Sequence, residues 1–227
     1  MPLKPNAPIE ITAFQWVPPF AQGLVRDLRA RWALEEAGLD YRTRLLDFQQ
    51  IPPEYLFEQP FNQVPALRNG DLHIFETGAI VQYVGERCEA LLPSDPEARY
   101  RAIQWTYAAL NSVEPALMNL VIIDIFNPDQ EWAKLRRPGA EEFVKVKLGR
   151  VADWLGDKDW LEGSFTAGDL LMVSVLRILR HTSLVAEFPN LGAYVKRGEA
   201  RPAFKQALAD QLASFEAHQP LPEGVAA

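Results

Sequence analysis

The sequence has little cysteine, histidine and basic charge. Its one cysteine, Cys88, has no partner for an intrachain disulfide, which is typical of a reducing compartment such as the cytoplasm. The three histidines are isolated from one another and lack metal-ligand spacing, so no zinc site is expected. The net charge of −7 argues against nucleic acid as the main partner, because phosphate binding requires a basic surface.

Long apolar runs are also missing. Residues 1–14 contain no apolar segment of the kind that a secretory signal needs. No run approaches the roughly 18 apolar residues of a membrane helix. Hydrophobic residues nevertheless make up 48% of the 227 residues, which is enough for a sizeable core. We therefore expect a soluble cytoplasmic protein with one large domain or two modest ones.

Residues 1–88 alternate between strand and helix patterns. Apolar residues recur at helical spacing from Leu24 onward, with Gly38 as the expected C-cap, and another helix pattern opens at Thr77. Asn69 and Gly70 predict a two-residue hairpin turn. The strands are predicted at 9–14, 41–46, 64–67 and 72–75, and the segment 51–60 is irregular or a short helix. This order predicts an α/β domain.

Only helix patterns follow residue 90. Residues 89–97 read as a linker rich in proline and polar residues. Thr166 and Asp169 predict a capping box before a strongly apolar helix. The helices are expected at 98–120, 141–155, from 170 onward, at 191–197 and at 202–215, with a polar, proline-containing insert at 127–139. We therefore predict an α/β domain at 1–88 and an all-helical domain at 98–227.

Two short motifs in the first domain suggest a binding site. A cis bond before Pro65 would turn the N–H and C=O of Val64 toward an extended ligand, although Pro65 could instead simply start an edge strand. Thr77, at a helix start, could bind a ligand carboxylate while Glu76 binds an ammonium group. The alternative is that Glu76 and Thr77 only cap the helix. The binding interpretation describes recognition of an α-amino-acid end.

These motifs resemble the soluble glutathione S-transferase superfamily. The resemblance rests on NQVPAL and FETGAIVQYV, with RWALEEAGLDY before them. It continues through LLPSDPEARYRAIQWTYAALNSVEPAL, GSFTAGDLLM and EFPNLGAYVKRGEARPAFKQAL and covers nearly the whole chain. It implies an N-terminal thioredoxin-like domain, an all-helical C-terminal domain, glutathione as cosubstrate without a metal, and a homodimer.

The resemblance also implies roles for individual residues. Val64, before what would be a cis Pro65, should pair through its backbone with the cysteinyl part of glutathione. Glu76 and Thr77 should hold the γ-glutamyl end. Candidates for contacts with the glycyl carboxylate or the peptide groups are Gln63 and either Gln49 or Gln50.

The sequence departs from the family at the residue that activates the thiol. Members use Tyr, Ser or Cys near the end of the first strand or the start of the first helix. This chain has no Ser, Thr, Cys or Tyr between Thr12 and Tyr41, and Pro18 stands where omega-like members have cysteine. Cysteine-dependent reductase chemistry at that position is thereby excluded. Other groups that could stabilise a thiolate are the backbone N–H groups near Phe20 to Gln22, the side chains of Gln22 and Gln15, and Tyr107 or Asn111.

Several functions remain open at this point. The first is a transferase that joins glutathione to a small apolar electrophile, with Phe20, Trp16 and Trp105 as possible pocket walls or simply core residues. The second is a non-catalytic module for glutathione, ligand binding or dimerisation. The third is a lyase, isomerase or dehalogenase of the same fold. The missing hydroxyl favours the module, whereas the two intact motifs favour glutathione binding. We favour an unusual transferase.

Overall fold

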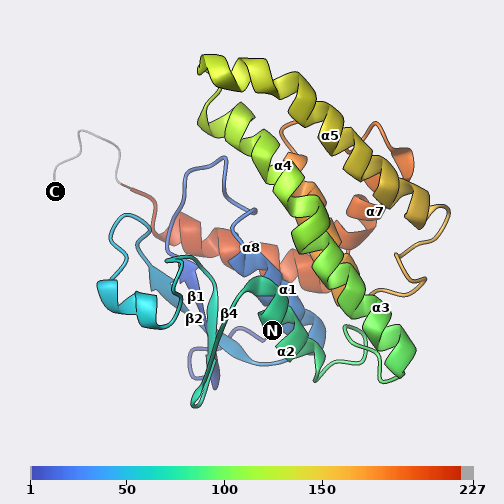
Figure 1. Ribbon diagram of the computed structural model, residues 1–227. Helices are drawn as coiled ribbons and strands as arrows, with labels where there is room; N and C mark the ends of the chain where they lie inside the picture. The colour runs from blue at the N-terminus through green and yellow to red at the C-terminus, as the bar shows by residue number, and fades with distance from the viewer. Residues whose placement is uncertain (1, 221–227) are drawn as a thin grey trace. The chain divides into compact units, whose positions relative to one another are not determined.

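The computed structural model describes residues 2–220, and their contacts form two compact units. One unit combines the residues up to Ile80 with those from Pro202 onward, and the other spans Val81–Arg201. The last helix of the chain is therefore grouped with the first unit rather than with the other helices. Figure 1 shows this helix, α8 (Pro202–Ala217), beside α1 (Asp27–Ala37).

A four-stranded mixed sheet forms the centre of the first unit. Its strands lie in the order β2-β1-β3-β4; β1 and β2 are parallel, and β3 is antiparallel to both β1 and β4. The strands are β1 (Ile9–Phe14), β2 (Tyr41–Leu46), β3 (Ala66–Asn69) and β4 (Leu72–Phe75). Because a parallel pair needs a crossover, α1 connects β1 with β2. This is the predicted thioredoxin-like arrangement.

The hairpin between β3 and β4 differs slightly from the prediction. β3 starts at Ala66 rather than Val64, since Pro65 has no N–H to donate to a sheet ladder. Asn69 still pairs with Leu72, so the two loop residues are Gly70 and Asp71 instead of Asn69 and Gly70. Gly70 has a φ of 61°, which glycine adopts at little cost.

Within the first unit, α1 packs on β1 and on α8. α1 ends as predicted at Gly38, which has a φ of 62°. The rings of Trp32 on α1 and Phe204 on α8 meet edge to face with centroids 4.9 Å apart, and both side chains are buried. The remaining elements are the 3₁₀ helix η1 (Pro53–Phe57) and α2 (Thr77–Gly85), which lies at the boundary between the two units.

The second unit is entirely helical over its described residues, as predicted. One helical run comprises α3 (Pro96–Tyr107), the π-helical η2 (Ala108–Val113), α4 (Glu114–Val121) and the π-helical η3 (Ile122–Phe126). α5 (Glu131–Leu155), which lies beside α4, is followed by α6 (Ala167–Leu176), the 3₁₀ turn η4 (Arg177–Leu179) and α7 (Pro189–Glu199) (Figure 1).

The predicted polar insert at 127–139 is wrong for most of its length. α5 begins at Glu131 and continues through Pro138. Proline removes one helical hydrogen bond, but Arg137 pairs with Asp124 at 2.8 Å and also with Glu141. Burial of Ala133 and Ala140 gives this polar segment an apolar face, so that packing overrides the breaker signal.

The helical run Pro96–Phe126 is long and apolar enough to cross a membrane by length and composition alone. Such a segment was not predicted from the sequence, because no uninterrupted apolar run approaches roughly 18 residues. In the structure this run packs against α5 and α6 inside the second unit. Ala109, Val113, Leu117 and Leu120 of this run are buried in the second unit.

The capping box at the start of α6 is present. Asp169 accepts hydrogen bonds from the N–H of Thr166 at 2.9 Å and from the N–H of Leu161 at 2.9 Å. The Tyr194 hydroxyl donates to the same carboxylate at 3.0 Å. Burial raises the pKa of Asp169, and these three donors oppose that effect. The box therefore fixes the beginning of the most buried helix.

Candidate functional site

The β3–β4 register brings the two predicted motifs together. Ala66 pairs with Phe75 across the antiparallel ladder. Val64 and Pro65 directly precede Ala66, and Glu76 and Thr77 directly follow Phe75, so both motifs adjoin this last pair of the ladder. The Val64–Pro65 peptide bond is cis. Both motifs thus lie at the same end of the hairpin.

Glu76 has an unusual backbone conformation at this end of the hairpin. Its φ of 68° lies in the left-handed region, which non-glycine residues adopt at a cost of about 1–2 kcal/mol. Its C=O accepts the first helical hydrogen bond from Ile80 at 3.0 Å, so Glu76 is the N-cap and Thr77, the predicted cap, is the first residue of α2. The Glu76 side chain is exposed. Such an outlier with an accessible carboxylate suggests a binding role.

Thr77 lies beside the buried guanidinium of Arg29. Arg29 was not identified as a site residue from the sequence. Thr77 is 5% exposed and Arg29 on α1 is 4% exposed. Arg29 Nη1 donates to Thr77 Oγ1 at 3.5 Å. The guanidinium adds positive charge near the N-terminus of α2, where the helix dipole already favours an anion. A possible sequence signal was the pair of arginines, Arg29 and Arg31, within an otherwise apolar helix.

Three further residues surround Val64 and were also missed. The Tyr55 hydroxyl donates to the C=O of Gln63 at 2.7 Å, and Gln59 Oε1 accepts from the N–H of Gln63 at 3.1 Å. Thr12 Oγ1 accepts from the N–H of Ala66 at 2.7 Å. The side chain of Gln63 is exposed, so its predicted ligand role uses a different part of the residue from these backbone contacts. Thr12 could have been noticed in the sequence as a polar residue within a largely apolar strand.

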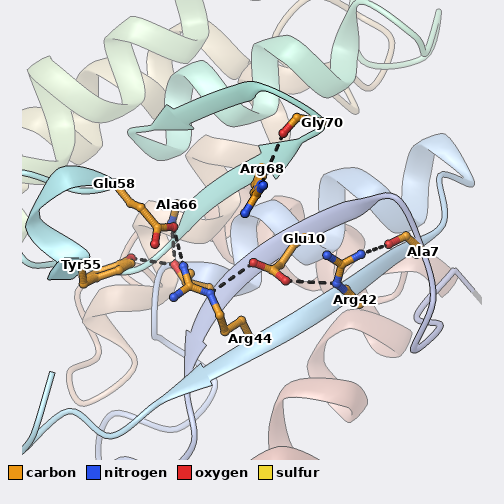
Figure 2. Close-up of polar contacts among 10 residues, drawn as sticks. Ala7, Glu10, Arg42, Arg44, Tyr55, Glu58, Ala66, Arg68 and Gly70 are labelled. Atoms are coloured by element: carbon orange, nitrogen blue, oxygen red, sulfur yellow. Dashed lines mark hydrogen bonds and ion pairs between the residues drawn. The ribbon is translucent and has the colours of Figure 1, made fainter. Parts of the chain in front are cut away.

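An ion-pair network covers the sheet beside this site (Figure 2). Glu10 on β1 accepts from Arg42 at 3.0 Å and from Arg44 at 3.2 Å. Arg44 also pairs with Glu58 and lies over the Tyr55 ring, 5.7 Å from its centroid. These contacts hold the segment around η1 against β2.

The expected thiolate-stabilising donors at Phe20 to Gln22 are arranged differently from the prediction. α1 begins at Asp27, so its N-terminus does not include these residues. The N–H groups of Ala21 and Gln22 donate to the carbonyls of Pro18 at 2.9 Å and Pro19 at 3.3 Å. The Gln22 side chain donates to the C=O of Val17 at 3.1 Å. Turns near the prolines therefore use donors that the prediction had assigned to a ligand.

The other predicted residues lie in varied surroundings. Gln49 and Gln50 are exposed in the loop after β2, and the N–H of Gln49 donates to Asp47 at 2.9 Å. Tyr107 is 54% exposed at the end of α3. Trp105 donates to Glu162 at 2.7 Å and its ring packs on Trp154, which supports its core interpretation.

Three more residues from the sequence analysis remain to be placed: Phe20, Trp16 and Cys88. Phe20 is 49% exposed and Trp16 is half-buried against Phe48. Cys88 lies beyond the end of α2 and is half-buried. Within residues 2–220, no three His, Cys, Asp or Glu side chains are grouped to hold a metal ion.

Comparisons with known sequences identify the family. Residues 21–86 match the glutathione S-transferase N-terminal domain, and residues 114–202 match the glutathione S-transferase C-terminal domain. Glutathione S-transferase F14 of Arabidopsis thaliana is 30% identical over 194 residues, covering 77% of this chain and 76% of the relative. Glutathione S-transferase 1 of Zea mays is 30% identical over 192 residues, covering 80% and 90%. This chain therefore belongs to the glutathione S-transferase family.

Solved structures agree with that assignment. A glutathione transferase from Burkholderia graminis, with two glutathione molecules bound per subunit, aligns with a TM-score of 0.77 at 26% identity, covering 88% of this chain and 87% of that chain. A glutathione transferase from Pseudomonas putida, with one glutathione disulfide bound per subunit, has a TM-score of 0.79 at 22% identity, covering 90% and 92%. The second likeness shows the fold alone.

Proposed function

We propose that this protein binds glutathione at the Val64 and Glu76 end of the β3–β4 hairpin and transfers it to a small apolar electrophile. The observation that carries the proposal is the pairing of Ala66 with Phe75, because Val64–Pro65 precedes the first of these residues and Glu76–Thr77 follows the second. The names of the relatives, and the glutathione bound to the Burkholderia protein, support the same ligand class.

Each part of glutathione has a complementary group in this site. The Val64 N–H and C=O pair with the cysteinyl residue as a short added strand. The exposed Glu76 carboxylate binds the α-ammonium of the γ-glutamyl residue. The Thr77 N–H at the start of α2, with the Arg29 guanidinium nearby, attracts the α-carboxylate. Gln63 and Gln50 are the proposed contacts for the rest of the tripeptide.

The transfer step requires a thiolate. The thiol loses its proton to solvent or base, the sulfur electron pair forms a C–S bond with the electrophilic carbon, and the leaving group or the adjacent carbon takes the displaced pair. The protein contributes proximity and a lowered thiol pKa. Because residues 13–40 contain no Tyr, Ser, Thr or Cys, the stabilising group is atypical, and the candidate within the first unit is Phe20.

The second candidate function is a glutathione-binding module without transferase chemistry. The absence of a hydroxyl or thiol between Thr12 and Tyr41 favours it. The two functions share the binding site and differ only in whether the bound thiol ionises. They are therefore separated by the ionisation state of bound glutathione.

We also propose that the protein is a cytoplasmic homodimer. In the first unit, Phe57 is 95% exposed and Phe61 is 64% exposed, and the Phe61 ring contacts that of Phe75. A second copy of the chain would cover this apolar surface. Sedimentation of the native protein and of a Phe57→Ser variant tests the dimer, and a monomeric native protein would contradict it.

The proposed function is tested by calorimetric titration with glutathione at neutral pH, with ultraviolet absorbance of the thiolate followed in the same samples. We expect the native protein to bind glutathione and Glu76→Ala to bind it more weakly. We also expect the thiolate absorbance of bound glutathione at pH values below the ordinary thiol pKa of roughly 8.5. Binding without that signal would select the non-catalytic module. No binding at millimolar glutathione would contradict both functions.

A further inference from the structure

We propose that Tyr55, Thr12 and Gln59 are positioning residues, which hold the peptide groups on both sides of Val64 so that the N–H and C=O of Val64 are left to pair with the ligand. This inference rests on the proposed glutathione binding. It assigns the affinity for the cysteinyl part of the ligand to a buried hydrogen-bond chain that the ligand never touches.

The direction of every hydrogen bond in this chain follows from donor counting. The Tyr55 hydroxyl has one hydrogen, which it donates to the C=O of Gln63 at 2.7 Å. The 2.7 Å contact between Tyr55 and Thr12 must then be donated by Thr12. The Thr12 oxygen in turn accepts from the N–H of Ala66 at 2.7 Å. One chain therefore runs from Ala66 through both hydroxyls to Gln63; Figure 2 shows Tyr55 and Ala66 at this site.

Gln59 completes the pairing on the other side. Its side chain is buried, at 2% exposed, and Oε1 accepts from the N–H of Phe61 at 2.7 Å and from the N–H of Gln63 at 3.1 Å. Both backbone polar groups of Gln63 are thus satisfied by side chains. No backbone group of Gln63 remains to compete for the ligand.

Val64 differs from Gln63 in the state of its backbone polar groups. Pro65 has no N–H, and the N–H of Ala66 is already bonded to Thr12. Among the residues that the structure describes, neither the N–H nor the C=O of Val64 has a hydrogen-bond partner. These are the two groups that an extended peptide would use to add itself as a strand. The surrounding side chains therefore occupy both backbone groups of Gln63 and the N–H of Ala66, and leave both groups of Val64 for the ligand.

The two hydroxyl groups of this hydrogen-bond chain are shielded from water, which makes the hydrogen-bond chain a rigid support. Tyr55 is 1% exposed and Thr12 is 2% exposed. Hydrogen bonds in such surroundings are stronger than in water, and a broken member leaves an unpaired buried group. Arg44 covers the Tyr55 ring and is itself held by Glu10 and Glu58. Burial raises the pKa of Tyr55, so its hydroxyl remains a donor at neutral pH.

The test uses variants that remove single hydroxyl groups. Tyr55→Phe and Thr12→Val break the chain with little change in shape, whereas Thr12→Ser keeps its hydroxyl. Tyr41→Phe is the matched control, because Tyr41 is also a fully buried tyrosine of the first unit and lies outside this chain. Thermal unfolding of every variant identifies those that remain folded at the titration temperature.

Two probes separate positioning from general stability. Glutathione uses the whole proposed site, whereas γ-glutamyl methylamide keeps only the α-ammonium and α-carboxylate end. We expect Tyr55→Phe and Thr12→Val to weaken glutathione about tenfold, with no change for γ-glutamyl methylamide in NMR shift titrations. Thr12→Ser and Tyr41→Phe should retain native affinity for both probes.

Three other results are possible, and each contradicts either the positioning proposal or the proposed glutathione binding. Equal losses for both probes would mean a merely structural role and would overturn the positioning proposal. Unchanged glutathione affinity in folded Tyr55→Phe and Thr12→Val would overturn it as well, while leaving glutathione binding intact. Failure of the native protein to bind glutathione would overturn the proposed function itself, and this inference with it.

Discussion

Arg31 and Asp27, one turn apart on α1, form an ion pair from which water is excluded. Arg31 Nε donates to Asp27 Oδ2 at 2.8 Å, and the two side chains are 0% and 1% exposed. Gln211 of α8 donates to the other carboxylate oxygen at 2.6 Å. The pair is therefore part of the contact between α1 and α8 within the first unit.

Asp27→Ala should destabilise the protein strongly. It leaves a buried guanidinium without its counter-charge, which costs about 3–5 kcal/mol when the partner cannot reach water. Urea unfolding followed by circular dichroism measures the loss. Glu97→Ala is the control, because Glu97 and Arg101 form an i,i+4 pair that is 83% and 56% exposed, and its loss should cost less than about 0.5 kcal/mol. Equal effects of the two substitutions would contradict the prediction.

Stability should depend on pH through Glu35. Burial, and after it the nearby Asp210, raises the pKa of Glu35 from 4.5 to about 7. Between these values the folded protein holds a proton that the unfolded chain has released, so this group makes stability fall as pH rises from about 4.5 to about 7. Above that range its contribution is constant.

Glu35→Gln should remove this part of the pH dependence. The variant should unfold a few degrees higher than the native protein at pH 8, and the difference should shrink toward pH 5. Calorimetric melting temperatures across this range measure it. Glu142→Gln, at an exposed position of α5, removes the same charge without burial and should leave the pH profile unchanged. A parallel profile for Glu35→Gln would show that Glu35 is not responsible.

Glu76→Gly should separate stability from ligand binding. Glycine adopts the φ of 68° without the Cβ penalty, so we expect the folded state to gain about 1 kcal/mol. The same change removes the carboxylate proposed for the ligand ammonium, so glutathione affinity should fall at least about tenfold. Glu76→Ala should lose affinity equally without the gain in stability. Thermal unfolding and calorimetry on the same samples distinguish the two variants, and retained affinity would remove Glu76 from the site.

Gly168→Ala should destabilise the second unit. An added Cβ would lie 2.5 Å from the Cβ of Trp105 and 3.1 Å from the backbone oxygen of Ala102, so α3 and α6 must separate. Overpacking of this kind costs about 1–3 kcal/mol. Gly139→Ala in α5 meets nothing within 4 Å and should stabilise by roughly 0.5–1 kcal/mol through helix propensity. Unfolding curves that place the two variants on the same side of the native protein would contradict this packing argument.

Local patterns were sufficient where neighbouring residues decide the conformation. Gly38 ends α1 and the Thr166–Asp169 box begins α6, because a left-handed cap and a reciprocal cap depend on a few consecutive residues. The same reasoning failed for Pro138. A proline signal predicts a break, but the ion pair of Arg137 with Asp124 and the burial of Ala140 depend on other parts of the chain.

The candidate site was only partly visible in the sequence. Val64, Pro65, Glu76 and Thr77 were selected because their residue types have a direct chemical use beside a strand or at a helix start. Tyr55 and Gln59 lie in a segment without periodicity, and nothing in that segment indicates what their polar atoms contact. Their partners are 8 and 4 residues away, at Gln63, while Thr12 is 43 residues from Tyr55.

The sequence by itself determined the strand and helix order of residues 1–88, the helical character of the residues after 90, and the resemblance that the comparisons confirmed. These depend on local periodicity and short motifs, which a linear chain carries explicitly. Only the tertiary structure decided that α8 packs on α1, that Arg29 lies beside Thr77, and that two buried hydroxyls brace the segment around Val64. Such contacts join residues far apart in the chain, and folding favours them because an unpaired polar group away from water is costly.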